Sequence, residues 1–519
     1  MIKKIDLRLA LQLAADPQQV RAAAAASVGW READIQVEVL RRSIDARQRQ
    51  AFVQLQVNVY KDEVPPAATD YLAQLHDVSD APEILIVGAG PAGYFAALQL
   101  IQEGFRPVII ERGKDVQARR RDLKAIQQDG TVNPHSNYCY GEGGAGTYSD
   151  GKLYTRSVKR GDWWKVLCLL VEHGANPDIL VEAHPHIGSN KLPKIVAEIR
   201  QTIEKHGGKV IFDSFVTDFI INNDAIAGVI VNENTEYRAE AVILATGHSA
   251  RDIYYLCQRK KVAMEAKPFA LGVRIEHQQS LIDTAQYRQS PRHELLPAAP
   301  YKLVTQVRER GVFSFCMCPG GLVVPAATAP GEIVVNGMSM SRRDSEFANS
   351  GTVTAIEISD FEPYKKHGVL AGLAFQQAVE QAMFAVSDGT QRAPAQRLTD
   401  FVQGKISSSL PKTSYIPGLI SAPLHEILPT FVSERLREGV KKFGQQMNGY
   451  FTENANVIGT ESRTSAPVRI PRNPDTLMHV HIQNLFPCGE GAGYAGGILS
   501  AAMDGQNVAT AIAKIYTKK

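Results

Sequence analysis

The pattern of apolar and polar residues near the start of the chain predicts a small β-α-β-β unit. Residues 2–9 have the composition of a strand, and an Asp-Pro pair then opens an Ala-rich helix that ends at Gly29. Every second residue is apolar over 35–39 and again over 53–59, which predicts two strands. This order is half of a ferredoxin-like fold. We assign residues 1–78 to an N-terminal α+β domain that ends in a polar, proline-containing linker.

The pattern changes after this linker. Residues 84–87 form a fully apolar run, which is typical of a buried parallel strand, and helical and strand-like segments then alternate. We therefore predict an α/β, Rossmann-like domain whose first part is 79–260. Residues 261–454 begin with strand-like pieces and end in helical ones, so we expect an inserted α+β domain there. Residues 455–519 return to a strand-loop-helix order and complete the first domain.

Composition narrows the class of protein. The 519 residues include 57 Lys+Arg and 54 Asp+Glu, a net charge of +3, which argues against a dedicated nucleic-acid or membrane-surface binder. Six cysteines without a CxxC pair argue against a disulfide scaffold and against a metal site. The uncharged run 311–331 contains prolines and glycines that a membrane-spanning helix would not carry. We expect a cytoplasmic protein with a sizeable core.

A glycine motif predicts dinucleotide binding. Gly88, Gly90 and Gly93 fit the pattern G-x-G-x-x-G directly after the apolar strand and before a helix. The first permits a tight turn, the second lets a pyrophosphate approach the backbone, and the third lets helix and strand pack closely. Glu111 ends the next strand, where a carboxylate accepts hydrogen bonds from ribose hydroxyls.

Three further segments favour FAD over NAD. The loop 141–153 is dense in glycine and allows close approach of a cofactor. A second apolar strand ends at Thr246 and Gly247, where the chain turns past the nucleotide. Glu490 is a candidate acceptor for a ribitol hydroxyl, and the N–H groups of 496–498 begin a helix whose positive end suits a reduced flavin. Each loop alone is also compatible with a structural turn, but together they indicate FAD.

These segments resemble flavoproteins with a glutathione-reductase-type FAD domain, on VGAGPAGYFAAL with Glu111, ATGHS and GEGAGYAGGI. More narrowly, nearly the whole chain resembles the bacterial FAD-dependent dehydrogenases, or NAD(FAD)-utilizing dehydrogenases, on NYCYGEGGAGTYSDGKL, PHIGSNKL, SMSRRDSEFANSG and TESRTSAPVRI. The resemblance implies an FAD cofactor, without a substrate, and FAD contacts at Gly88, Gly90, Pro91, Ala92, Gly93, Glu111, Gly144, Gly146, Thr147, Lys152, Val216, Gly247, Gly489, Glu490, Gly497 and Ile498. Arg112, Thr246 and Gly496 complete the candidate cofactor-binding set.

The sequence leaves the electron donor of the flavin open. A second G-x-G-x-x-G unit, such as disulfide reductases use for NADPH, does not occur, although NADH or NADPH stays open as an electron donor. The nearest cysteine pair, Cys316 and Cys318, is better interpreted as a buried apolar strand edge than as a dithiol relay. Cys488 precedes the last glycine loop, and we expect it near the flavin as a packed small side chain.

Candidate catalytic residues lie in and beside the inserted domain. Arg342 and Arg343 are candidates to hold a carboxylate or phosphate, or are solvated surface residues. Glu461 and Arg463 lie where the chain returns to the first domain, either in a cleft or as internal ion pairs. His186 is a candidate acid or base, or a turn residue.

The resulting prediction is an FAD-dependent oxidoreductase that transfers hydride through flavin N5 to or from a small substrate. The alternative is a flavoprotein that binds or modifies an RNA or protein partner through its N-terminal domain. A basic turn (Arg41, Arg42, Arg47 and Arg49) and the run Arg119–Arg121 favour it, whereas the near-neutral charge counts against it. A third reading is a flavin that never turns over. Substrate, oligomeric state and catalytic residue do not follow from the sequence.

Overall fold

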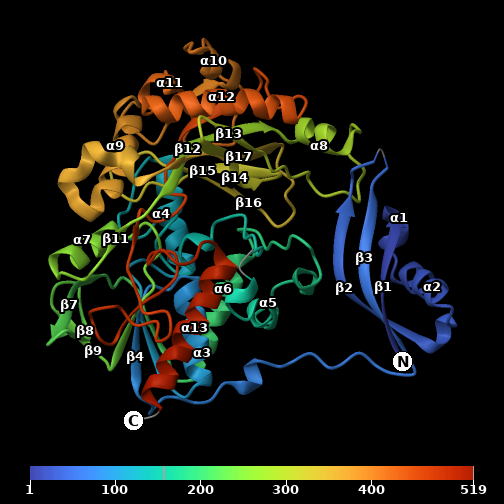
Figure 1. The fold of residues 1–519 in the computed structure, drawn as a ribbon, viewed down its shortest axis with the longest axis horizontal. Helices are drawn as coiled ribbons and strands as arrows, with labels where there is room; N and C mark the ends of the chain where they lie inside the picture. Colours follow the sequence, from blue (N-terminus) through green and yellow to red (C-terminus); the bar gives the residue numbers. More distant parts are fainter. Residues whose placement is uncertain (49, 156–157, 518–519) are drawn as a thin grey trace.

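The computed structural model describes residues 1–48, 50–155 and 158–517. A five-stranded parallel sheet and a seven-stranded mixed sheet form the body of the molecule, and a three-stranded sheet stands beside them (Figure 1). Within the described ranges, none of the helices combines the length and apolarity that crossing a bilayer requires.

The N-terminal unit has the predicted β-α-β-β order. Its antiparallel sheet has the strand order β1-β3-β2, with β1 at Ile2–Ala10, β2 at Ile35–Asp45 and β3 at Phe52–Lys61. Helix α2 (Pro17–Val28) is capped at its start by Asp16 and follows the four-residue α1 (Leu11–Ala14). Its buried residues pack on the alternate apolar positions of β3, as the period of two in the sequence requires.

The parallel sheet has the strand order β22-β10-β4-β5-β6, which confirms the Rossmann-like α/β class. Every residue from Ile84 to Val87 in the central strand is buried, because both faces of the sheet are covered. The strands are β4 (Glu83–Val87), β5 (Arg106–Ile110), β6 (Lys209–Ile211), β10 (Ala241–Leu244) and β22 (Leu485–Pro487).

The two faces of this sheet carry different layers. Ile84 and Ile86 pack with a layer of helices, which Figure 1 shows side by side: α3 (Pro91–Gln102), α5 (Trp163–Glu172), α6 (Leu192–Lys205) and α13 (Ile498–Tyr516). Leu85 and Val87 face the opposite layer, formed by α7 (Arg251–Arg259) and an antiparallel sheet of β7 (Val216–Asn222), β8 (Ala225–Val231) and β9 (Thr235–Arg238).

The inserted region forms the seven-stranded sheet, in the order β13-β14-β17-β12-β20-β18-β19. Helices α9 (Ala371–Ala385), α10 (Leu398–Gln403), α11 (Leu424–Ile427) and α12 (Thr430–Gln446) lie around its outer side in Figure 1. Its strands are β12 (Phe269–Gln278), β13 (Val304–Val307), β14 (Arg310–Cys318), β17 (Phe347–Ile356), β18 (Ala393–Arg397), β19 (Leu419–Ser421) and β20 (Asn456–Glu461).

Strand β20 begins at Asn456, beyond residue 454, where we expected the insertion to end. Strand β20 lies inside the sheet, between β12 and β18. The sheet of the inserted domain is therefore completed by the segment in which the chain returns to the first domain. A hairpin of β15 (Gly321–Pro325) and β16 (Val335–Ser339) and a short pair of β11 (Glu265–Ala266) and β21 (Val468–Arg469) complete the strands of the body. Helix α8 (Gln279–Tyr287) follows β12.

The basic residues of the N-terminal turn are mostly engaged. Arg42 pairs with Asp178 and Glu182 of the body, and Arg47 pairs with Asp45 within the turn. Arg49 lies outside the described residues. Arg119, on α4 (Val116–Gln128), is fully buried and donates to three backbone carbonyls. Arg42 and Arg119 are therefore taken up by contacts within the protein, whereas Arg41, Arg120 and Arg121 are exposed.

Candidate cofactor and catalytic site

A cavity opens at the carboxyl end of the parallel sheet, where that sheet meets the inserted domain. Its wall includes the residues that directly follow β4, β5 and β10, together with the start of α13. On the other side it is lined by Phe315 and Cys316 of β14, Asn336 of β16, Glu461 of β20, and Arg463. Ligands of open α/β sheets bind at this edge.

The glycine turn has the geometry that the motif predicts. Gly88 has a φ of +109°, and a side chain there would meet the carbonyl oxygen of Ala245 at 2.5 Å. A Cβ on Gly93 would lie 2.0 Å from the Gly88 oxygen, so helix α3 and the turn pack too closely for any side chain. Gly90, by contrast, has no atom within 4 Å of an added Cβ. The space beside its backbone is therefore open for a ligand.

Glu111 is buried and joins three backbone segments. Its Oε2 accepts a hydrogen bond from the N–H of Ala89 at 2.8 Å, and its Oε1 accepts from Gly113 and Gly141 at 2.9 Å each. Glu111 therefore holds the glycine turn against the loop that carries Gly144 and Gly146. Sequence reasoning assigned it only a ribose contact, because two of its three backbone partners, Ala89 and Gly141, lie 22 and 30 residues away along the chain.

Glu490 and the start of α13 form the other end of the cavity. Burial raises the pKa of Glu490 to about 8, although the nearby Lys267 acts in the opposite direction. Gly497 and Ile498, which begin the 19-residue α13, also line the cavity. The free N–H groups and positive dipole end of a helix favour a ligand that carries negative charge.

Most of the predicted cofactor residues line this cavity, and four do not. Thr147 donates to the carbonyl of Glu142 at 2.9 Å, and the Gly489 N–H donates to Asp504 at 2.7 Å. Gly93, Thr147, Gly489 and Gly496 are not among its lining residues. Those that line it are Gly88, Gly90, Pro91, Ala92, Glu111, Arg112, Gly144, Gly146, Lys152, Val216, Thr246, Gly247, Glu490, Gly497 and Ile498.

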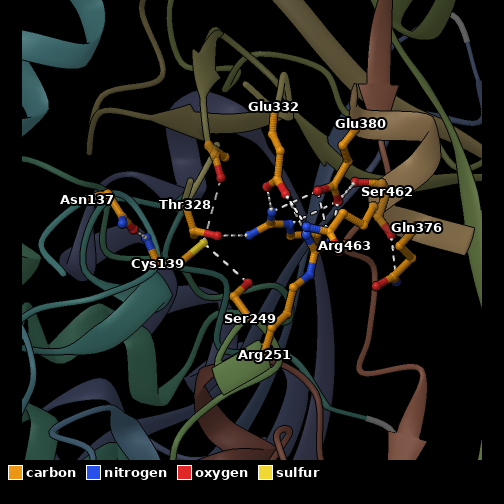
Figure 2. Close-up of polar contacts among 12 residues, drawn as sticks. Asn137, Cys139, Ser249, Arg251, Thr328, Glu332, Gln376, Glu380, Ser462 and Arg463 are labelled. Carbon is orange, nitrogen blue, oxygen red and sulfur yellow. Dashed lines mark hydrogen bonds and ion pairs between the residues drawn. The ribbon is translucent and has the colours of Figure 1, made fainter. Parts of the chain in front are cut away.

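Arg463 belongs to a buried network of opposite charges (Figure 2). Its guanidinium binds Glu380 on α9 and Glu332 on the β15–β16 loop at 2.8 and 2.9 Å. Arg251 of α7 binds the same two carboxylates at 2.8 and 3.0 Å. Burial opposes ionisation of Glu380, but the two arginines lower its pKa to about 2. Two cations and two anions thus neutralise each other between the two domains.

Glu461, which like Arg463 lies where the chain returns to the first domain, also forms an internal ion pair. Its Oε2 accepts from Arg274 Nε at 2.7 Å, and both side chains are buried. Glu461 and Arg463 both form internal ion pairs, and both also line the cavity.

Arg342, Arg343 and His186 do not line the cavity. Arg343 pairs with the buried Asp150, whereas Arg342 is exposed. Burial and the charge of Arg343 lower the pKa of His186 to about 4, and its ring bonds the Ser341 carbonyl at 3.2 Å. His186 is thus a neutral loop residue near neutral pH.

Sequence reasoning missed a cluster at the cavity wall. Lys152 Nζ lies 3.5 Å from Asp150 Oδ2, 3.9 Å from Cys316 Sγ and 4.0 Å from Cys318 Sγ. The only signal was the Cys-Met-Cys sequence, which we interpreted as an apolar strand edge. Cys488, expected near the flavin, is fully buried and is not a lining residue.

Comparison with known proteins identifies the family. The chain is 41% identical over 498 residues to an uncharacterized protein of Clostridium beijerinckii, with 91% of each chain covered. The protein belongs to the same family. A family model described as FAD-dependent protein, C-terminal domain-like, matches residues 268–464, and one described as Glucose inhibited division protein A matches 191–276. A domain of unknown function matches residues 1–60.

More distant similarities cover parts of the chain. A thiamine thiazole synthase of Methanococcus maripaludis is 26% identical over 198 residues, 36% of this chain and 63% of that protein. The solved structure of CtdE in complex with FAD is 12% identical with a TM-score of 0.35, covering 83% of this chain and 84% of that one. A geranylgeranyl bacteriochlorophyll reductase-like structure from Thermoplasma acidophilum is 13% identical with a TM-score of 0.36, covering 84% and 79%.

The family matches make this protein an FAD-dependent flavoprotein. The residues present fit that cofactor. Gly90 leaves open space where a pyrophosphate approaches the backbone, and α13 directs its positive end at the same cavity.

Proposed function

We propose that this protein is an FAD-dependent dehydrogenase that transfers a hydride between flavin N5 and a small substrate held by the inserted domain. The observation that carries the proposal is the composition of one cavity. A glycine turn and a helix N-terminus line one side of it, and polar side chains of the inserted domain line the other. Such a cavity brings a dinucleotide and a second molecule together.

The first domain supplies the cofactor contacts in this proposal. The backbone at Gly88 and Gly90 would hold the pyrophosphate, and Glu111, which holds the turn, would accept hydrogen bonds from the ribose hydroxyls. Val216, at the start of β7, lines the cavity and would contact the adenine. A protonated Glu490 would donate a hydrogen bond to the ribitol chain as well as accept one, which a carboxylate could not do.

Bound FAD supplies reversible two-electron chemistry at its ring system. The chain itself stabilises negative charge at the Gly497 end of α13 and excludes water through the buried walls of the cavity. On the substrate side, the guanidinium of Arg463 is already paired with Glu332 and Glu380. A neutral or weakly polar small molecule therefore suits this side without leaving a charge uncompensated.

We also propose a cytoplasmic location, since all six cysteines are free.

The test is an anaerobic titration of the purified holoprotein, first with NADH and then with NADPH, followed in the visible spectrum. Prompt bleaching of the flavin bands supports a dehydrogenase that takes its electrons from a nicotinamide. If neither nucleotide bleaches the flavin, a screen of reduced organic substrates follows. Failure of every donor to reduce the flavin would contradict the proposal and favour a flavin that does not turn over.

A further inference from the structure

Two thiols lie beside the same ammonium group in the cavity wall. Cys316 Sγ is 3.9 Å from Lys152 Nζ, and Cys318 Sγ is 4.0 Å from the same nitrogen. Cys316 lines the cavity, whereas Cys318 is completely buried. The two residues stand at the end of β14, where the pairing with β17 shifts register between Phe315 and Cys318.

At this shift in register the backbone of β14 departs from a regular strand. Cys316 has a φ of +44°, a left-handed conformation that a residue with a side chain seldom adopts. Such conformations persist where the surrounding structure holds them, and they concentrate at functional sites. Here the holding contacts are the Cys318 thiol, which donates to the Cys316 carbonyl at 3.3 Å, and the Arg274 guanidinium, which donates to it at 3.4 Å.

Lys152 is itself fixed in place. It donates to the carbonyl of Met317, between the two cysteines, and its charge is balanced by Asp150 at 3.5 Å. Asp150 is buried and is held by Arg343 and by the Ser339 hydroxyl. Asp150 and the Met317 carbonyl therefore hold the Lys152 ammonium beside the two sulfur atoms.

The surroundings shift the pKa values of the two thiols in opposite directions. The neighbouring Cys318 side chain lowers the pKa of Cys316, burial opposes this, and the charges of Lys152 and Arg274 add to the lowering. The neighbouring Cys316 side chain and burial raise the pKa of Cys318. Elsewhere burial alone raises the pKa of a cysteine, as at Cys257, to about 12. A reactive thiolate next to a protonated second cysteine is the arrangement of redox-active pairs.

The position in the cavity connects this pair with the flavin end. Cys316 shares the cavity with Glu490 and Gly497, and its negative charge is among the causes that raise the pKa of Glu490. Cys139 also lines the cavity, but its sulfur contacts the Ser249 hydroxyl and the Ala326 carbonyl. It is the natural control for a cavity cysteine outside this pair.

We propose that Cys316 and Cys318 are a redox-active thiol pair that exchanges two electrons with the flavin bound in this cavity. The inference rests on the proposed function, because the flavin is its electron acceptor. In the oxidising direction a sulfur–sulfur bond forms between the Cys316 thiolate and Cys318, and the S–H bond of Cys318 breaks. The two electrons and the proton reduce the oxidised flavin, so charge and hydrogen balance. The reverse step reduces the disulfide.

The test counts electrons in the holoprotein after oxidation with diamide and removal of the oxidant. An anaerobic dithionite titration followed at the flavin band should consume about four electrons per flavin in the unmodified protein, since flavin and disulfide each take two. Cys316→Ser and Cys318→Ser should each consume about two, and Cys139→Ser about four. Mass spectrometry of the oxidised protein, digested without reductant, should find the peptide with both cysteines lighter by two hydrogen atoms.

The outcomes separate the two proposals. If the protein binds FAD but takes up only about two electrons per flavin, and the peptide keeps its full mass, the thiol pair is wrong and the dehydrogenase proposal stands. If the reconstituted protein shows no flavin spectrum, the proposed function fails and the pair fails with it. The peptide mass does not depend on any substitution, so a variant that fails to fold leaves the test intact.

Discussion

The Arg463 guanidinium and the Glu380 carboxylate form a two-point contact, with Nε–Oε1 at 3.0 Å and Nη2–Oε2 at 2.8 Å. Arg463 stands where the chain returns from the inserted domain, and Glu380 lies on α9 of that domain. Arg251 of α7 completes the contact from the first domain (Figure 2). This buried pair therefore determines how the wall of the cavity is joined to both domains.

Removal of the Arg463 side chain should destabilise the protein strongly. Arg463→Ala leaves Glu332 and Glu380 with only Arg251 to balance two buried carboxylates, so we expect a loss of about 3–5 kcal/mol in the free energy of unfolding. Arg342→Ala, at an exposed arginine, should change it by less than about 0.5 kcal/mol. Urea denaturation measures both. Equal, small effects would show that the network does not hold the domains.

Substitutions in the glycine turn should separate folding from cofactor binding. Gly90 has a φ of −79° and open space around an added Cβ, so Gly90→Ala should keep the thermal stability of the flavin-free protein. It should weaken FAD binding by about 1–3 kcal/mol, roughly 5- to 150-fold, because the methyl group would occupy space needed by the pyrophosphate. Fluorescence titration with FAD measures the affinity.

Gly93→Ala is the matched comparison. Its Cβ would lie 2.0 Å from the Gly88 carbonyl oxygen, a backbone atom that cannot move away, so the flavin-free protein itself should lose stability. Thermal denaturation of the two variants should therefore differ. A Gly90→Ala protein with unchanged FAD affinity would contradict the placement of the pyrophosphate.

Glu490 should make the stability of the flavin-free protein depend on pH. Burial raises its pKa to about 8 in the folded state, from 4.5 in a solvated chain. Between these values the folded state keeps a proton that the unfolded state has released, so the contribution of Glu490 to stability falls as pH rises. Glu490→Gln cannot titrate and should gain stability relative to the unmodified protein between pH 5 and about 9. Urea midpoints across this range give the difference, and a constant difference would refute the raised pKa.

Lys152 should control the reactivity of Cys316. Lys152→Met removes the ammonium that lies 3.9 Å from the sulfur, while Asp150 keeps Arg343 as its partner. Loss of this charge raises the pKa of the Cys316 thiol and lowers its thiolate fraction, so alkylation by iodoacetamide near pH 7 should slow, by up to about tenfold for each unit by which the pKa rises above the assay pH. Peptide mass spectrometry follows the rate at each cysteine. Cys139 should react at an unchanged rate; slowing at both sites would indicate a general change in the cavity.

Local sequence patterns predicted most of the fold. The apolar run at Ile84–Val87 and the glycine spacing after it predicted the parallel sheet and its turn, because backbone geometry and burial on both faces leave few alternatives over such short segments. The switch from alternating elements to strands followed by helices indicated the inserted domain. The pattern did not show that β20 completes its sheet, since strand pairing is a long-range contact.

By itself, the sequence determined that this chain is an FAD-type α/β protein, because motifs such as Gly88 to Gly93 act through neighbours a few residues away. Only the tertiary structure decided which charges and thiols meet. Lys152 and Cys316 are 164 residues apart, and Arg463 is 83 residues from Glu380. No periodicity relates such positions. The contact of Lys152 with Cys316 depends on how the first domain packs against the inserted domain, and the same packing brings Arg251 to Glu332 and Glu380.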